Sequence, residues 1–206
     1  MKLYFSYGTC ALAPHIVLRE AGLAFDLERV DLRTHLTHDG VDYYQINPKG
    51  SVPLLELDSG ERLTEGPVIC QYVADKARNV TLMPAAGTME RYRVMEWQNY
   101  ISSEMHKTYS VLFNAEVDAP VKAVFRAALR KKYEWVESRL AAAAFLTGTN
   151  FTAADAYLFT VSRWAKSVEM DLAGLPALHA FMEAVHARPA VRVALDAEKV
   201  ASAKKH

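Results

Sequence analysis

The sequence has few of the features that mark secreted or membrane proteins. Only two of the 206 residues are cysteine, Cys10 and Cys70, which excludes a scaffold held together by disulfides. No apolar run approaches the length that spans a membrane, and Leu3-Tyr4-Phe5 is too short for the core of a signal peptide. We therefore expect a cytoplasmic protein with no membrane partner.

The sequence also lacks an excess of charge of either sign. Its 24 Lys and Arg balance 24 Asp and Glu, so no net field draws the chain to nucleic acid. The histidines lack the spacing of metal ligands, and the glycines lack the spacing of a phosphate-binding loop. We expect neither a nucleic-acid partner nor a bound metal. Apolar residues make up 51% of the chain, which is enough for one large core or two small ones.

The first eighty residues alternate between strand and helix patterns. Strand patterns cover residues 2–6, 25–30, 54–57 and 62–63, and helical patterns cover residues 13–21 and 67–78. This order predicts a β-α-β unit followed by a β-β-α unit. A connector rich in Pro and Gly follows, after which strand patterns disappear. We expect a first domain over residues 1–80, a linker over 81–89 and an all-helical domain over 90–206. Thr152 and Asp155 have the spacing of a capping box at the start of a buried helix.

Two neighbouring segments suggest a binding site. Val52-Pro53 predicts a tight turn, with a cis bond, at the entry to an edge strand, which leaves the backbone of Val52 able to pair with an extended ligand. Glu65-Gly66-Pro67 places a carboxylate and a flexible residue before a helix, whose first amides attract anions. Together they suit a zwitterionic, peptide-like ligand.

Cys10 lies just before the helix predicted over residues 13–21. The amides and dipole of that helix favour a lowered pKa and a reactive thiolate, whereas the alternative is a small buried apolar side chain. Cys70 falls inside a predicted amphipathic helix, where we expect it only to pack. Polar side chains at Asn99, Ser103, His106 and Ser110 have spacings of four, three and four, which place them on one helix face. That face is either functional or simply solvated.

Further segments, taken in order, carry a resemblance to a known family. They are residues 5–10, His15, 18–20, 30–32, 47–50, Val52-Pro53, 64–66, Gln71-Tyr72, Ala74-Asp75, Arg91-Tyr92, Glu96-Trp97, His106-Lys107 and 154–159. Along nearly the whole chain the sequence resembles the bacterial beta class of glutathione transferases. The resemblance implies an α/β thioredoxin-like N-terminal domain and an all-α C-terminal domain that carries the electrophile pocket and the contacts of a homodimer.

The resemblance also implies roles for individual residues. Cys10 would face the sulfur of glutathione, Val52 would pair with its cysteinyl part, and Glu65 and Gly66 would hold its γ-glutamyl end. In the helical domain, Asn99, Ser103, Glu104, Met105 and His106 would complete the glutathione site, partly across the dimer, with Cys10 and His106 as catalytic residues. Candidates for the apolar acceptor wall are Tyr109, Phe113 and Trp164; each is equally compatible with a plain core position.

Three positions depart from the beta-class pattern. His35 replaces a Lys implicated in holding the glycyl carboxylate, which predicts weaker or pH-dependent affinity for glutathione. Tyr7 stands where Pro is common and Ala11 where Ser is common, both close to the expected sulfur site.

The leading functional hypothesis is an enzyme that adds the glutathione thiolate to small hydrophobic electrophiles, with glutathione as co-substrate and no metal. An alternative in the same fold is a glutathione-dependent thiol-disulfide transferase, reductase or dehalogenase that uses Cys10. A third possibility is a non-catalytic ligand-binding or scaffold protein, because fold does not guarantee chemistry.

Overall fold

The computed structural model describes residues 1–203, which form two compact units. The first unit contains Met1–Met83 together with the described residues from Ala187 onward, and the second is Pro84–His186. The domain limits expected from the sequence placed residues 90–206 together in the helical domain. The contacts group the last helix with the first unit instead.

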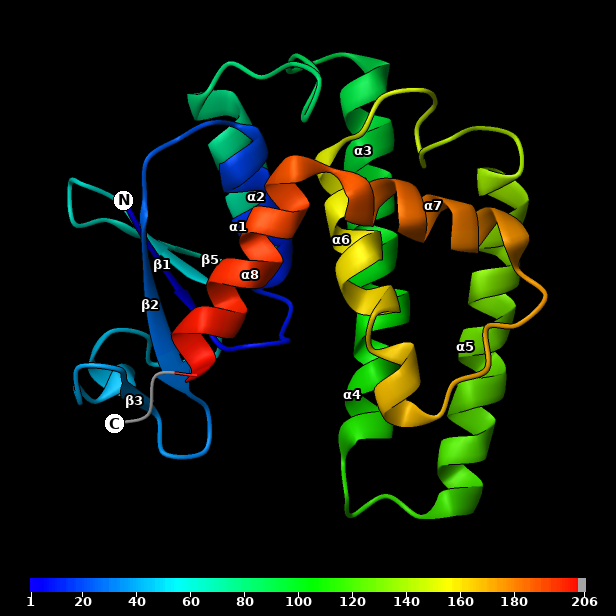
Figure 1. Ribbon diagram of the computed structural model, residues 1–206, viewed down its shortest axis with the longest axis horizontal. Coiled ribbons are helices and arrows are strands. Elements are labelled where there is room, and N and C mark those ends of the chain that lie inside the picture. Colours follow the sequence, from blue (N-terminus) through cyan, green and yellow to red (C-terminus); the bar gives the residue numbers. More distant parts are fainter. Residues whose placement is uncertain (204–206) are drawn as a thin grey trace. The chain divides into compact units, whose positions relative to one another are not determined.

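A five-stranded mixed sheet forms the centre of the first unit (Figure 1). Its order is β3-β2-β1-β4-β5, with β1 at Lys2–Phe5, β2 at Asp26–Asp31, β3 at Leu36–Thr37, β4 at Leu54–Glu56 and β5 at Arg62–Thr64. The central strand β1 is parallel to β2 and antiparallel to β4, with Leu3 opposite both Leu27 and Leu55. This arrangement confirms the predicted thioredoxin-like domain.

Two details of the sheet differ from the prediction. The two-residue strand β3 lies in a stretch that sequence analysis did not assign to a strand, and it pairs with the end of β2. The strand after Val52-Pro53 is internal, flanked by β1 and β5, so the expected edge strand is wrong. Pro53 is tolerated because it precedes β4, where no hydrogen bond between strands requires a backbone amide.

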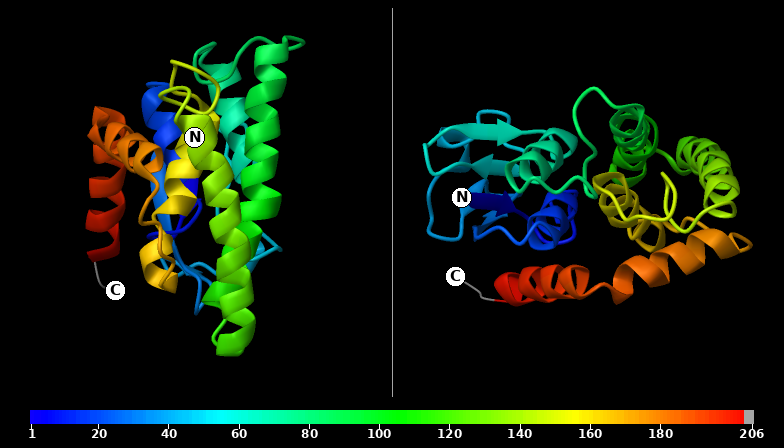
Figure 2. Two further views of the ribbon diagram at one scale, coloured as in Figure 1. Left: turned by 90° about the vertical axis from the view of Figure 1, so that its right-hand side faces the viewer. Right: turned by 90° about the horizontal axis from the view of Figure 1, so that it is seen from above.

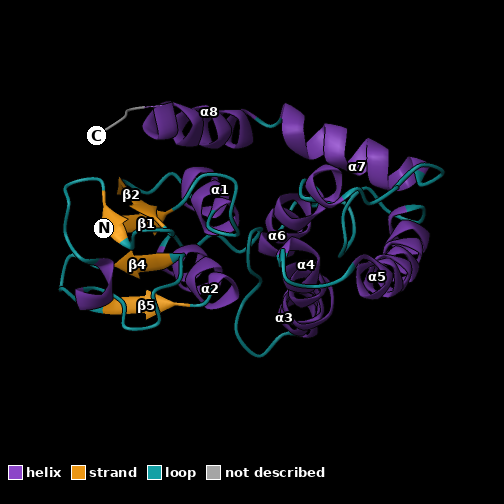
Figure 3. Cartoon of the chain, turned by 90° about the horizontal axis from the view of Figure 1, so that it is seen from below, coloured by secondary structure: helices purple, strands orange, loops and turns teal. Residues whose placement is uncertain are grey.

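Helices α1 at Leu12–Glu20 and α2 at Gly66–Lys76 pack together on one side of the sheet (Figure 3). Helix α8 at Pro189–Ala203 packs on α1. Two polar contacts fasten it there: Arg188 donates to both carboxylate oxygens of Glu20 at 2.6 and 2.9 Å, and His15 Nδ1 lies 3.0 Å from Glu198 Oε1 in a fully buried pair. These contacts explain why α8 belongs to the first unit.

The second unit is helical. Its elements are α3 at Met89–Tyr100, the π-helix η2 at Ile101–His106, α4 at Lys107–Phe113, α5 at Ala119–Leu140, α6 at Ala153–Ser162, the short 3₁₀ helix η3 at Ala165–Val168, and α7 at Pro176–Ala187. Helices α3, η2 and α4 join into one rod, and α5 runs alongside it (Figures 1 and 2). No strand is assigned in the described residues of this unit, as predicted for an all-α domain.

Helix α6 is the core of this unit, because all ten of its residues are buried. The predicted capping box begins it. The Asp155 carboxylate accepts hydrogen bonds from the amide and hydroxyl of Thr152, at 2.8 and 2.7 Å, and from the Leu146 amide at 2.9 Å. Within residues 1–203, no helix has the length and apolar character needed to cross a membrane.

Candidate functional site

Cys10 lies in the loop between β1 and α1, where its thiol donates a hydrogen bond to the carbonyl oxygen of Val52 at 3.4 Å. Burial raises the pKa of Cys10 to about 11, and the negative charges of Glu65 and Glu198 add to the rise. The expected lowering of this pKa is therefore wrong. The first amides of the helical segment, those of Leu12 and Ala13, donate to the carbonyls of Thr9 and Cys10 rather than to the sulfur.

The turn at Val52 is held by its neighbours. The carbonyl of Ser51 accepts hydrogen bonds from Asn47 Nδ2 at 2.7 Å and from the hydroxyl of Tyr43 at 3.0 Å. The Val52-Pro53 bond is cis, as predicted. Within the described chain, the Val52 amide makes no backbone hydrogen bond. The turn therefore presents the Val52 amide as a free donor. The Val52 carbonyl accepts only the weak hydrogen bond of the Cys10 thiol.

Glu65 stands at the N-terminal end of α2 with a positive φ of 68° and an exposed side chain. The ammonium group of Lys49 lies 2.9 Å from its carboxylate and 3.0 Å from the hydroxyl of Thr64. Lys49 therefore brings the segment from Asn47 to Gly50 into contact with the segment around Glu65. A single ligand site formed by both segments requires this contact. Lys49 was not among the predicted site residues; its place in the run Asn47-Pro48-Lys49-Gly50 was the available signal.

His35 occupies the turn between β2 and β3 with a φ of 54°. Its ring lies against that of Tyr44, with centroids 4.4 Å apart. Its Nδ1 atom is buried and has no hydrogen-bond partner among the described residues. Two other residues, Tyr7 and Ala11, depart from the beta-class pattern. Tyr7 is 53% exposed, whereas Ala11 is completely buried and belongs to the core. Only Tyr7 is accessible to a ligand.

The polar stripe of the helical unit is interrupted by the π-helix η2. A π-helix turns less per residue than an α-helix, so the angles between residues spaced by three and four differ from those expected for an α-helix. Asn99, Ser103 and Ser110 are exposed, while His106 is partly buried. The hydroxyl of Ser103 donates to the carbonyl of Asn99 at 3.0 Å. That these four side chains form one functional face stays a prediction.

His106 points into an aromatic cluster. Its Nδ1 lies 2.7 Å from the hydroxyl of Tyr157, and its ring meets those of Tyr157 and Trp164 edge to face. Burial, with the charge of Lys107 adding to it, lowers the pKa of His106 to about 4. The imidazole is neutral near pH 7. Tyr157 lies in the buried helix predicted after Thr152 and in the segment 154–159 that carries the family resemblance, but no local pattern indicates its contact with His106 across 51 residues.

The two residues before His106 have different surroundings. The carboxylate of Glu104 is exposed and lies 2.7 Å from the ammonium group of Lys132. Met105 is completely buried, so neither its side chain nor its backbone is exposed to a ligand in this structure.

The three predicted acceptor-wall residues form one ring cluster but differ in access. Phe113 is 50% exposed and packs edge to face on Trp164, which is 9% exposed. Tyr109 is completely buried, and its hydroxyl lies 2.8 Å from that of Tyr133. Tyr109 is a core residue in this structure, so it cannot line an open wall. Phe113 and Trp164 stay candidates.

Residues 1–203 contain no group of three or more His, Cys, Asp or Glu side chains arranged to hold a metal ion.

Comparison with known proteins identifies the family. The glutathione S-transferase N-terminal domain matches residues 7–76, and the glutathione S-transferase C-terminal domain matches residues 100–189. The chain belongs to the glutathione S-transferase family. It is 45% identical to glutathione S-transferase GstA of Escherichia coli O157:H7 over 198 residues, which cover 96% of this chain and 98% of that protein.

Solved structures of bacterial glutathione S-transferases have the same fold. A ternary complex of BphK is 48% identical, with a TM-score of 0.94 over 97% of this chain and 100% of its own. A sphingomonad glutathione S-transferase complexed with glutathione is 40% identical, with a TM-score of 0.93 over 97% and 100%. The beta-class glutathione S-transferase of Sphingomonas chungbukensis is 40% identical, with a TM-score of 0.92 over 96% and 98%. The predicted family and fold are confirmed, and the chain is a transferase of the bacterial beta-class type.

Proposed function

We propose that this transferase binds glutathione in its first unit and joins the glutathione sulfur to small hydrophobic electrophiles. One observation carries the proposal: the Cys10 thiol and the backbone of Val52 meet at 3.4 Å, next to a free Val52 amide. A cysteinyl residue needs a donor for its carbonyl, an acceptor for its amide and a polar partner for its sulfur. This loop and turn offer all three.

When glutathione binds, the hydrogen bond between Cys10 and Val52 is replaced by hydrogen bonds to the ligand. The amide of the glutathione cysteine is a stronger donor than a thiol, so it takes the Val52 carbonyl and releases the S–H group of Cys10. Cys10 then donates to the glutathione sulfur and stabilises its thiolate. A raised pKa suits this role, because only the protonated thiol can donate.

The γ-glutamyl end of glutathione carries an ammonium group and a carboxylate. Glu65 supplies a carboxylate for the ammonium group, and the amide of Gly66 begins a helix whose positive dipole end suits the carboxylate. Lys49 already holds Glu65 in place at 2.9 Å. His35, beside Tyr44, is the candidate partner of the glycyl carboxylate.

Conjugation of an aromatic chloride illustrates the chemical step. The glutathione thiol loses its proton to solvent, the thiolate attacks the ring carbon, a C–S bond forms, and chloride leaves with the electrons of the C–Cl bond. The protein contributes by stabilising the thiolate and by holding the sulfur next to the acceptor. Cys10 itself forms no covalent bond during this reaction.

The helical unit supplies the remaining candidates. Phe113 and Trp164 present apolar rings for the electrophile, and the neutral His106 is a further hydrogen-bonding group beside Trp164. Asn99 and Ser103 are the exposed polar candidates for glutathione, with the carboxylate of Glu104 beside them; Met105 is buried.

We also propose a two-fold homodimer in the cytoplasm. Met89 and Tyr92 on α3 are 62% and 53% exposed, which suits a surface covered by a second copy. Two free cysteines are compatible with a reducing compartment. Sedimentation analysis of the wild-type protein and Tyr92→Glu tests the dimer. We expect a dimer for the former and a shift towards monomer for the latter; a monomeric wild type contradicts this part of the proposal.

The function is tested by retention on immobilised glutathione and by the rate of conjugation of 1-chloro-2,4-dinitrobenzene. We expect both binding and a rate that saturates with glutathione. Cys10→Ser should lower the rate only moderately, since a hydroxyl also donates, whereas a thiol-transfer enzyme would lose disulfide reduction completely. A protein that binds neither glutathione nor a glutathione conjugate would overturn the proposal.

A further inference from the structure

Asn47 is a polar residue of the first unit that is almost completely buried, with 3% of its surface exposed. It lies in the segment between the short 3₁₀ helix η1 at Tyr43–Gln45 and strand β4. A buried amide is costly unless it forms hydrogen bonds, so the partners of the Asn47 side chain indicate what it does. Those partners belong to both halves of the proposed glutathione site.

The amide nitrogen of Asn47 fixes the peptide that carries the Val52 N–H group. Nδ2 donates to the carbonyl oxygen of Ser51 at 2.7 Å, and the hydroxyl of Tyr43 donates to the same oxygen at 3.0 Å. The peptide that joins Ser51 to Val52 is trans, so its C=O and N–H groups point in opposite directions. Because the oxygen is turned towards Asn47 and Tyr43, the free Val52 amide is directed away from them, where a ligand can accept its proton.

The amide oxygen of Asn47 supports the other half of the site. Oδ1 accepts a hydrogen bond from the backbone amide of Lys49 at 3.2 Å. The ammonium group of Lys49 lies in turn 2.9 Å from the carboxylate of Glu65 and 3.0 Å from the hydroxyl of Thr64. Glu65 is the proposed partner of the ligand's ammonium group. One buried side chain is therefore connected to the cysteinyl part and to the γ-glutamyl part of the site.

The backbone holds Asn47 itself in one place. Its amide donates to the carbonyl of Tyr43 at 2.8 Å, and its carbonyl accepts from the amide of Gly50 at 2.8 Å. Gly50 has a φ of 65°, and a Cβ atom at this position would lie 2.6 Å from the ring of Tyr44, so the loop requires glycine there. The loop therefore gives the Asn47 side chain a fixed base from which to orient its partners.

From these contacts we propose that Asn47 is a positioning residue for glutathione. Its Nδ2 aims the Val52 amide at the cysteinyl carbonyl of the ligand, and its Oδ1 keeps Lys49 beside Glu65. This role rests on the proposed function, because it concerns the same site. Asn47 acts through Val52 and Lys49, so it affects the affinity for glutathione and not the chemical step. The competing explanation is that Asn47 only stabilises the loop, in which case its loss lowers the amount of folded protein and leaves the affinity unchanged.

Calorimetric titration with glutathione and steady-state kinetics with 1-chloro-2,4-dinitrobenzene separate the two explanations. Asn47→Ala should raise Kd and KM for glutathione at least about fivefold and leave kcat within about twofold of the wild type. Asn47→Asp keeps an oxygen for the Lys49 amide and loses the donor to Ser51, so it should also raise both constants. Tyr43→Phe removes the second donor to Ser51 and is the milder variant, with an expected rise of about twofold to threefold.

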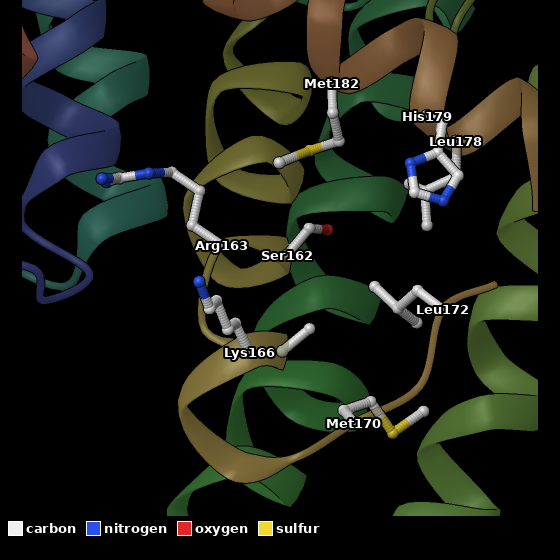
Figure 4. A pocket seen from close by; sticks show the side chains of 9 residues that line it. Ser162, Arg163, Lys166, Met170, Leu172, Leu178, His179 and Met182 are labelled. Atoms are coloured by element: carbon white, nitrogen blue, oxygen red, sulfur yellow. The ribbon is translucent and has the colours of Figure 1, made fainter.

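Two controls separate positioning from stability. Gln45→Ala removes an exposed side chain of η1 that contacts only the Asp42 carboxylate, and it should leave KM for glutathione unchanged. Leu178→Ala removes a buried side chain beside a cavity of about 380 Å³ in the second unit (Figure 4). It should lower the stability of the protein without changing KM for glutathione.

A double substitution tests the connection through Lys49. Lys49→Met should weaken glutathione, and Asn47→Ala/Lys49→Met should weaken it by less than the product of the two single losses, because both residues act on Glu65. A loss equal to that product would overturn the connection to Lys49. A wild type that binds glutathione, with unchanged KM in Asn47→Ala and Asn47→Asp, would overturn the role of Asn47 alone. A wild type that does not bind glutathione would overturn the proposed function and this role with it.

Discussion

The Cys10 thiol donates a hydrogen bond to the carbonyl oxygen of Val52 across 3.4 Å and across 42 residues of sequence. This contact joins the loop after β1 to the turn before β4, so it connects the proposed sulfur site to the proposed backbone-pairing site. Burial is the main cause of the raised pKa of Cys10, and the thiol that stays protonated is the form that donates to Val52.

The ionisation of Cys10 provides the first prediction. With its pKa raised to about 11, Cys10 should react slowly with iodoacetamide at pH 7.5, and the rate should rise about tenfold per pH unit towards pH 11. Mass spectrometry of the carboxamidomethylated peptide measures the rate. Cys70, buried within α2, is the internal control and should stay unmodified while the protein is folded. Rapid modification of Cys10 at pH 7.5 would show a thiolate and contradict the account.

The raised pKa of Cys10 should also make the free energy of unfolding depend on pH. The pKa of Cys10 is higher in the folded protein than in the unfolded chain, where a thiol ionises near its ordinary value of 9.0. Stability linked to Cys10 is therefore fully present below about pH 9 and is lost as the pH rises towards about 11. Urea unfolding of wild type and Cys10→Ser at pH 8 and pH 10.5 measures it. We expect the wild type to lose more stability than Cys10→Ser over this interval.

His106 should show the opposite dependence on pH. Its pKa is lowered to about 4 in the folded protein, against an ordinary value of 6.5 when unfolded. The unfolded chain therefore binds more protons between these values, and stability linked to His106 falls as the pH drops from about 6.5 to about 4. NMR titration of the imidazole should give a midpoint well below 6. A midpoint near 6.5 would mean that His106 is solvated rather than buried beside Tyr157.

Tyr157→Phe tests the contact of His106 directly. Removing the hydroxyl that lies 2.7 Å from His106 Nδ1 leaves a partly buried ring nitrogen without that partner, which should cost about 1–3 kcal/mol in the free energy of unfolding. Tyr7→Phe changes a ring that is 53% exposed and should cost almost nothing. Equal effects of the two substitutions, measured by urea unfolding, would argue against the hydrogen bond.

The pair of His15 and Glu198 should be the most sensitive polar contact of the first unit. Both side chains are buried, and their atoms lie 3.0 Å apart. Removing one partner of such a pair leaves a buried polar group uncompensated, so Glu198→Ala should cost about 3–5 kcal/mol. Glu96→Ala, which breaks an exposed pair with Arg93, should cost less than about 1 kcal/mol. A loss below about 1 kcal/mol for Glu198→Ala would mean that α8 contributes little to this unit.

Patterns that act over a few residues predicted most of the fold. The alternation of β1 and β2 around α1, the hairpin of β4 and β5, and the capping box of Thr152 and Asp155 all depend on neighbours in the sequence. The strand β3 was missed because two residues carry too little periodicity. The π-helix that ends at His106 was missed because the same residues also satisfy α-helical spacing.

Contacts between distant residues could not be predicted in this way. The packing of α8 depends on His15 and Glu198, which are 183 residues apart. The pKa of Cys10 depends on burial beneath the Val52 turn, and that of His106 on burial beside Tyr157. In both cases the sequence identified the residue type and its element, whereas the protonation state follows from the packing of the folded chain.

If the turn at Val52 and the start of α2 hold glutathione, Glu65→Gln should bind it more weakly than the wild type does. Charge-assisted hydrogen bonds contribute about 1.5–3 kcal/mol, so loss of the carboxylate should weaken binding by roughly tenfold or more in a calorimetric titration. Glu61→Gln, which removes a neighbouring exposed carboxylate on the same hairpin, should bind glutathione as the wild type does. Equal affinity of Glu65→Gln, Glu61→Gln and the wild type would contradict the account.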